Sequence, residues 1–238
     1  MSDEQNILKS LYPFMDQAMP KDETQPQTLL SYTIEDSVLL TSIQKKANES
    51  IQTKQAYFKA NEVKLLAAAK MVAEVYQNNG KMLTMGNGGS NCDASHLAVE
   101  FLHPVTAGRQ ALPAINLGAD ATMITAASND LGYENAFMRQ LIALANCNDI
   151  LIGFSTSGCS ENLINGFEKA KKLGLKTLAF AGMNGGDMLK SQAVDLCLVV
   201  ESNSVHRIQE SHLTTYHILW DLVHSLLADN RKSQVNQS

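Results

Sequence analysis

Five short apolar runs alternate with segments of helical spacing from residue 81 onward. The apolar runs lie at residues 82–85, 114–117, 150–154, 177–181 and 196–200. The helical segments lie at residues 92–102, 121–127, 135–145 and 162–173, with a short one near Met188. Strands joined through helices pair in parallel, because each crossover returns the chain to the same end of the sheet. The pattern therefore predicts an α/β fold, with a doubly wound, five-stranded parallel sheet flanked by helices.

The segments on either side of this pattern are also predicted to be helical. Residues 34–58 have helical apolar spacing, and Asn61 is a candidate N-cap for a second helix that ends at 78–80. Residues 205–229 form a long amphipathic segment. These helices carry more apolar surface than one five-stranded sheet can cover. The surplus favours helix-mediated oligomerisation, and the alternative is a thicker monomeric core.

Two loops follow apolar runs and precede helical segments. The glycine loop, residues 86–90, reads GNGGS, and the hydroxyl loop, residues 155–160, reads STSGCS. In each loop, backbone N–H groups and the positive end of a helix dipole face the space above the sheet. If the two strands are neighbours, the loops can hold a phosphorylated small molecule between them.

The two loops differ in how strongly they indicate a ligand. The glycine loop begins a GxGxxG motif, but Asn91 stands at the third glycine, which argues against a dinucleotide site. A ligand loop and a plain turn therefore remain equal alternatives for this segment alone. The hydroxyl loop has four hydroxyl side chains within six residues and no lysine. That composition favours a phosphate site built from N–H and O–H donors over a Walker loop or a simple turn.

Histidine and carboxylate side chains provide candidate chemistry. His96 and Glu100 are four residues apart and share one helix face. They form either an exposed helix pair or a site that binds a metal or moves protons. Gln209 and His217 are ~12 Å apart along a regular helix, so one shared site needs an irregular helix or two protomers. In the second case the apolar stripe at Tyr216, Leu219, Trp220 and Val223 would be a subunit interface.

Composition restricts the partners and the compartment. The net charge of −5 argues against a nucleic-acid partner, and no apolar run reaches the ~18 residues of a membrane helix. The acidic N-terminus is unlike a secretory signal, and the four cysteines are scattered. We therefore expect a cytoplasmic protein without disulfide bonds.

Several separated motifs resemble those of one family. They comprise GNGGS with the following CDA, His96-x-x-x-Glu100, Asn129-Asp130, STSGCS, and Arg207-Ile-Gln-Glu with His217. In this order and spacing, across residues 45–228, the chain resembles phosphoheptose isomerases. These are sugar isomerase (SIS) domain proteins that interconvert sedoheptulose 7-phosphate and D-glycero-D-manno-heptose 7-phosphate through an enediol.

The resemblance implies a role for each matching residue. The residues implied to bind the sugar phosphate are Asn87, Gly88, Gly89, Glu100, Asn129, Asp130, Ser155, Thr156, Ser157, Ser160 and Gln209. Those implied to bind one zinc ion per subunit are His96, Glu100, Gln209 and His217. Enediol chemistry needs a base and an acid, for which Glu100 and His217 are the candidates. The family also implies a homotetramer with active sites at subunit interfaces.

The chain departs from the family at three places. Asn91 stands where the family usually has His, and His206 replaces the Asp that commonly precedes Arg-Ile-Gln. Residues 1–45 have no counterpart, so we expect an N-terminal helical extension over 1–45 and the SIS domain over 46–238. Two alternatives to the heptose reaction remain: a non-catalytic SIS protein that binds a sugar phosphate as sensor or assembly factor, and an isomerase of another phosphosugar.

Overall fold

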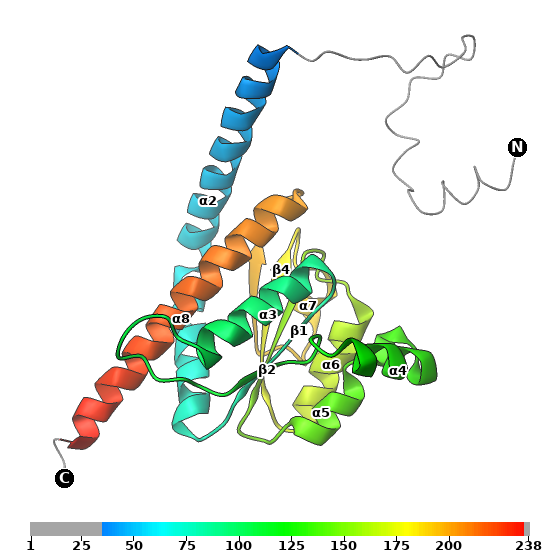
Figure 1. Ribbon diagram of the computed structural model, residues 1–238, viewed down its shortest axis with the longest axis vertical. Coiled ribbons are helices and arrows are strands. Elements are labelled where there is room, and N and C mark those ends of the chain that lie inside the picture. The colour runs from blue at the N-terminus through cyan, green and yellow to red at the C-terminus, as the bar shows by residue number, and fades with distance from the viewer. Residues whose placement is uncertain (1–34, 236–238) are drawn as a thin grey trace, which may run out of the picture. The chain divides into compact units, whose positions relative to one another are not determined.

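The computed structural model describes residues 35–235, and describes side chains as far as residue 228 (Figure 1). Most of the expected N-terminal extension, residues 1–34, lies outside the described residues. The chain separates into two compact units, residues 1–42 and 43–238. The second unit holds the sheet and all the candidate site residues.

The predicted order of strands and helices is confirmed. The helices and strands of the described part are, in chain order, α2 (Asp36–Gln77), β1 (Met82–Gly86), α3 (Gly89–Leu102), β2 (Ala114–Asn116), α4 (Ala121–Leu131), the 3₁₀ turn η2 (Tyr133–Asn135), α5 (Met138–Leu144), β3 (Ile150–Ser155), α6 (Glu161–Lys172), β4 (Lys176–Gly182), α7 (Gly186–Lys190), β5 (Leu196–Val200) and α8 (Val205–Val235). All five strands pair in parallel in the order β2-β1-β3-β4-β5. The fold is the predicted doubly wound sheet.

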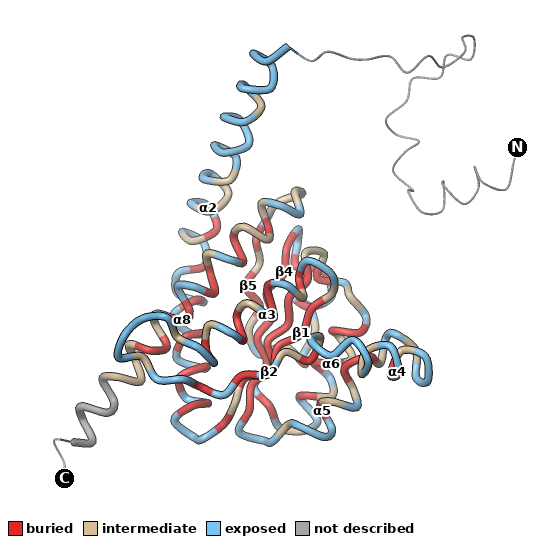
Figure 2. The backbone as a smooth tube through the Cα atoms, in the orientation of Figure 1, coloured by how far each residue is buried: buried red, intermediate tan, exposed pale blue. Residues whose placement is uncertain are grey.

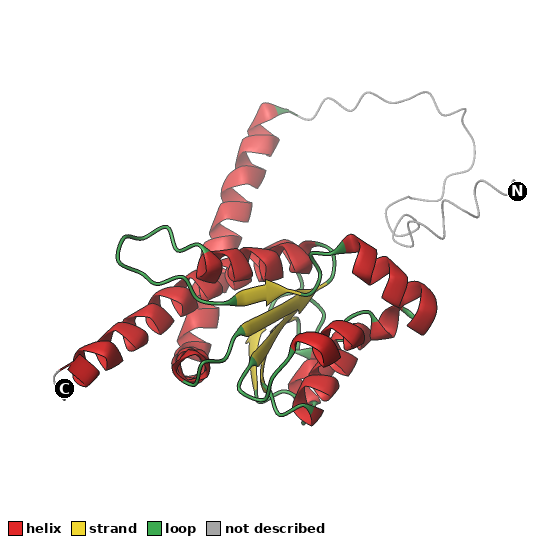
Figure 3. Ribbon diagram, turned by 60° about the horizontal axis from the view of Figure 1, so that its bottom comes forward, coloured by secondary structure: helices red, strands yellow, loops and turns green. Residues whose placement is uncertain are grey.

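The strands are buried on both faces, which explains their continuous apolar runs. In β3, Ile150 and Ile152 pack on the face covered by α2, α3 and α8, whereas Leu151 packs on the face covered by α5, α6 and α7. This alternation follows from the two-residue repeat of a strand. Figure 3 shows the sheet between the two helical layers. In Figure 2 most of the residues in the strands are coloured as buried.

The N-terminal helical segment is one helix, so the prediction of a break near Asn61 is wrong. Helix α2 runs through 42 residues that include neither proline nor glycine. Asn61 lies in its interior, and Asn61 Nδ2 donates a hydrogen bond to the Tyr57 carbonyl 3.0 Å away. The side chain therefore bonds to the preceding turn instead of capping a new helix. The predicted end at residues 78–80 is confirmed, because the Gly80 N–H closes the helix on the Val75 carbonyl.

The apolar stripe of α8 belongs to the core of the monomer. Tyr216, Leu219, Trp220 and Val223 are at most 9% exposed and pack with α2, α3 and the sheet. The expectation that this stripe forms a subunit interface is therefore wrong, because its side chains are buried within the monomer. In the described part of the chain, no helix combines the length and apolar character needed to cross a membrane.

Candidate active site

The two predicted ligand loops lie side by side at the carboxyl edge of the sheet. Strands β1 and β3 are neighbours, and Gly86 at the end of β1 pairs with Phe154 near the end of β3. The strand order reverses between these two strands, at the kind of switch point where open α/β sheets bind ligands. The condition under which the two loops can hold one ligand, that their strands are neighbours, is therefore met.

Asn87 connects the glycine loop to the helix that follows the hydroxyl loop. Its side-chain amide forms two reciprocal hydrogen bonds with the amide of the buried Asn162, of 2.8 and 2.9 Å. Asn87 Oδ1 also accepts a bond of 2.7 Å from the Tyr133 hydroxyl. These bonds set the spacing between the start of α6 and the glycine loop. Sequence reasoning did not identify Asn162 or Tyr133.

The hydroxyl loop gathers three serine hydroxyls. The Oγ of the buried Ser155 lies 3.0 Å from Ser160 Oγ and 3.4 Å from Ser157 Oγ, and it accepts a bond from the Gly158 N–H. Gly158 has a φ of +70°, and a Cβ there would lie 2.2 Å from the Gly185 carbonyl oxygen, so only glycine fits. The half-buried Thr156 completes the loop.

Neither helix that begins at these loops has a side-chain cap at its N-terminus. Gly88 precedes α3 and Ser160 precedes α6, and neither forms a side-chain capping bond. The first N–H groups of a helix have no partner within the helix and attract anions. Two such ends beside the serine hydroxyls can bind the oxygen atoms of a phosphate group.

His96, Glu100 and His217 converge on one point. Each offers a ligand atom, and these atoms lie within 4.8 Å of one another. His96 Nε2 is 3.1 Å from Glu100 Oε1 on the same face of α3, and the His217 ring approaches from α8 with its centroid 5.1 Å from that of His96. Two imidazoles and a carboxylate form a donor set that suits zinc. All three residues come from one chain.

Gln209 lies at the other end of the same helix pair. A Cβ at Gly89 would be only 2.4 Å from Gln209 Nε2, so the Gln209 amide covers the start of α3. Helices α3 and α8 pack together and run in the same direction, because Gln209 lies against Gly89 while His217 lies against His96. Gly89 precedes His96 by seven residues, which is about 10 Å along α3. This contact therefore places Gln209 at the glycine loop, and His217 alone of the two lies at the cluster.

Comparison with known proteins shows the family of this chain. A family model of the SIS domain matches residues 47–182. The phosphoheptose isomerase of Thermodesulfovibrio yellowstonii is 42% identical over 185 residues, which cover 78% of this chain and 91% of the relative. That of Helicobacter pylori strain P12 is 45% identical over 159 residues, covering 67% of this chain and 82% of the relative. This chain belongs to the phosphoheptose isomerase family of SIS-domain proteins.

Solved structures of the family have the same fold. A phosphoheptose isomerase from Francisella tularensis superposes with a TM-score of 0.74 at 34% identity, over 78% of this chain and 98% of that one. The phosphoheptose isomerase from Neisseria gonorrhoeae superposes with a TM-score of 0.73 at 32% identity, over 79% of this chain and 99% of that one.

Asn129 and Asp130, which the resemblance assigns to the sugar phosphate, lie on α4, outside the glycine and hydroxyl loops. Both are exposed near the end of α4, and Asn129 Nδ2 donates to Asp130 Oδ1 at 2.8 Å. Within the described part of the chain, no hydrogen bond joins either side chain to the glycine or hydroxyl loop. Tyr133, shortly after them, is the residue that reaches Asn87.

The two positions that depart from the family have different surroundings. Asn91 Nδ2 donates to the Gly118 carbonyl at 3.2 Å, so this residue attaches α3 to the segment after β2. His206 is exposed in the first turn of α8. A shallow depression beside α3 includes both Asn91 and His96.

Two aromatic residues contact the cluster from α8, and the buried Asp93 lies near one of them, Tyr216; the sequence predicted none of these positions. The Tyr216 hydroxyl is 2.8 Å from His96 Nδ1, and Trp220 Nε1 donates to the Glu100 carbonyl at 2.8 Å. Buried Tyr and Trp usually find such partners, but the sequence does not reveal which ones. Asp93 is 9% exposed, and burial raises the pKa of its carboxyl group to about 7. Its Oδ2 has no hydrogen-bond partner among the described residues.

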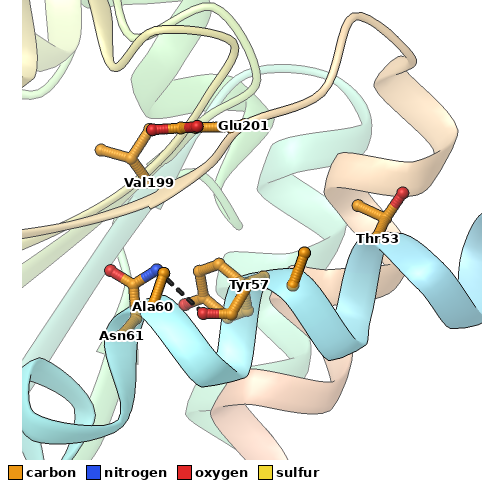
Figure 4. Close-up of a pocket in the computed structure, with 7 residues that line it drawn as sticks. Thr53, Tyr57, Ala60, Asn61, Val199 and Glu201 are labelled. Carbon is orange, nitrogen blue, oxygen red and sulfur yellow. Dashed lines mark hydrogen bonds between the residues drawn. The ribbon is translucent and has the colours of Figure 1, made fainter.

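A second pocket lies between α2 and the end of β5, away from the cluster (Figure 4). Its lining consists of Thr53, Ala56, Tyr57, Ala60, Asn61, Val199 and Glu201. None of the residues predicted to bind zinc or sugar phosphate lines this pocket, so it is separate from the candidate active site.

Proposed function

We propose that the protein interconverts sedoheptulose 7-phosphate and D-glycero-D-manno-heptose 7-phosphate through an enediol intermediate. The observation that carries the proposal is a cluster of three side chains. His96 and Glu100 come from α3, the helix that begins at the glycine loop, and His217 comes from α8. Membership of the phosphoheptose isomerase family supports the choice of sugar.

The phosphate group is assigned to the space between the two loops. Ser155, Ser157 and Ser160 gather their hydroxyls there, and the uncapped start of α6 adds backbone N–H donors. The remaining assignments to the sugar phosphate follow the family: Asn87, Gly88, Gly89, Thr156, Asn129, Asp130, Gln209 and Glu100. The assignment of the reactive end of the sugar to Glu100 also follows the family.

Glu100 and His217 are assigned to the proton transfers. Glu100 acts as the base that moves a proton between C1 and C2, and His217 as the acid for the sugar oxygens. Their ligand atoms are close enough to act on adjacent atoms of one substrate. The bond from Trp220 to the Glu100 carbonyl holds that turn of α3 against α8 and so helps to orient the carboxylate.

The same side chains are assigned to one zinc ion per subunit. The imidazoles of His96 and His217, the Glu100 carboxylate and the Gln209 amide are suitable donors. When bound, zinc would supply an electrophile for the negative charge that develops on the substrate oxygens. A carboxylate that ligates a metal is a weaker base, so we propose that Glu100 alternates between the two roles.

We also propose a cytoplasmic homotetramer with active sites at subunit interfaces, a SIS domain over residues 46–238 and a helical extension over residues 1–45. Exposed apolar side chains on α2 support assembly through this helix: Ile43, Ile51, Val63 and Leu66. The exposure of His217 is consistent with an active site completed by a neighbouring subunit.

The decisive experiment is incubation with sedoheptulose 7-phosphate and a small panel of other ketose phosphates, with products identified by NMR. We expect the aldoheptose 7-phosphate as product, with solvent deuterium incorporated at C2. Turnover of a different ketose phosphate alone would mean that the site serves another phosphosugar, which the exposed His206 in place of the family's Asp makes the second candidate. Binding of sugar phosphate without any turnover would refute the isomerase assignment.

A further inference from the structure

The imidazole of His96 has a partner at each ring nitrogen. Its Nε2 lies 3.1 Å from Glu100 Oε1, and its Nδ1 lies 2.8 Å from the Tyr216 hydroxyl. Tyr216 is 1% exposed and extends from α8, whereas His96 and Glu100 belong to α3. The buried Tyr216 hydroxyl thus contacts Nδ1, the imidazole nitrogen that does not face Glu100.

The chemistry of the two partners determines where the imidazole proton lies. A carboxylate only accepts hydrogen bonds, so the contact with Glu100 requires a proton on Nε2 in the metal-free neutral imidazole. Nδ1 is then an acceptor, and the Tyr216 hydroxyl donates to it. When a metal occupies Nε2, that nitrogen has no proton and Nδ1 carries it instead. The same hydroxyl then accepts from Nδ1, because a hydroxyl is both donor and acceptor.

The surroundings hold the tyrosine ring in place. The ring packs edge-on against Phe154, with the centroids 6.0 Å apart, and against His217 at 5.0 Å. This packing keeps the Tyr216 hydroxyl at Nδ1.

We infer that Tyr216 is a positioning residue for the metal cluster, because its hydroxyl orients the His96 imidazole in both the metal-free and the metal-bound tautomer. This inference rests on the proposed zinc site at His96, Glu100 and His217. Phenylalanine at position 216 keeps the packing but removes both hydrogen-bonding roles. The imidazole would then keep only its contact at Nε2. Its orientation is less fixed, which weakens the metal site.

The test compares zinc affinity of Tyr216→Phe with that of a matched control, measured by competition with a chromophoric chelator. The control is Tyr76→Phe, which removes a hydroxyl from the same core layer, where it donates to the Pro113 carbonyl at 3.3 Å. We expect Tyr216→Phe to bind zinc about 10- to 100-fold more weakly than the wild type. The control should stay within about twofold. Equal losses in the two variants would attribute the effect to general loosening of the core and overturn the inference.

A second measurement does not require metal. In ¹⁵N-histidine NMR spectra of the zinc-free protein above neutral pH, we expect the wild-type His96 signals of the tautomer protonated on Nε2. In Tyr216→Phe we expect a shifted Nδ1 signal, because that nitrogen loses its hydrogen-bond donor. Identical His96 signals in both proteins would overturn the inference. Failure of the wild type to bind zinc would instead refute the proposed metal site, and the NMR comparison would still decide the role of Tyr216.

Discussion

Replacing Asp93 by asparagine should make the zinc-free protein more stable at alkaline pH relative to the wild type. Burial raises the pKa of the Asp93 carboxyl group to about 7, from an ordinary value of 3.8. Between these values the folded protein holds a proton that the unfolded chain has lost. The free energy of unfolding therefore falls as pH rises through this window, and asparagine has no proton to lose.

The size of the effect follows from the two pKa values. A full pKa unit corresponds to about 1.4 kcal/mol, and integration from pH 5 to pH 8 gives a contribution of about 2.5 kcal/mol. This figure is an upper limit, because a side chain with some solvent contact relaxes when it becomes charged. The unpartnered Oδ2 supports the sign, since no hydrogen bond within the described residues stabilises the carboxylate.

The assay is urea unfolding of both proteins at pH 5 and pH 8, with a chelator present and at one protein concentration. The pH dependence contributed by other groups cancels in the difference between the two proteins. That includes buried His212, where desolvation lowers the pKa to about 4 and acts in the opposite direction. Asp187→Asn, at an exposed site on α7, is the control and should show no such difference. A carboxyl carbon of Asp93 that titrates near pH 4 by NMR would refute the reasoning.

Three further predictions concern the active site. Glu100→Gln should abolish solvent deuterium incorporation at C2 while sugar phosphate still binds, and more than about a tenth of wild-type kcat, a loss under ~1.4 kcal/mol, would contradict its role as base. Ser157→Ala should weaken binding of substrate and of competing inorganic phosphate by ~1–3 kcal/mol, and unchanged affinity would show that the hydroxyl loop is only a turn. Mixed oligomers of Glu100→Gln and His217→Ala subunits should stay inactive, because both residues serve one site in the same chain. Recovery after demonstrated subunit exchange would place them in different chains.

Most of the secondary structure could be predicted because its signals are local. Every predicted strand is found within about one residue of its expected ends, since apolar runs between glycine-rich and polar segments have few other interpretations. The errors occur where a local signal has two meanings. Asparagine is a common helix-cap residue, but Asn61 lies inside an uninterrupted helix, where its amide donates a hydrogen bond to the Tyr57 carbonyl. Helix α3 begins at Gly89, earlier than expected, because glycines do not indicate a helix start by themselves.

The site was predictable in part. The spacing of His96 and Glu100 places both on one helix face, and the structure confirms their contact. The long separation of Gln209 from His217 allowed no decision between one chain and two. The structure places Gln209 against Gly89 and His217 against His96, because α8 runs in the same direction as α3. The apolar repeat of one helix does not specify the direction of the helix that packs against it.

The sequence alone determined the elements, the two loops at the sheet edge and the chemical groups available there, because these depend on residues close together in the chain. Only the tertiary structure decided that the apolar stripe of α8 is core, that Asp93 is buried and that the Tyr216 hydroxyl meets His96. Tyr216 and His96 are 120 residues apart, and their hydrogen bond forms because α3 and α8 pack against each other over the same face of the sheet. Burial and hydrogen bonding between distant segments depend on that packing, which periodicity within one segment does not specify.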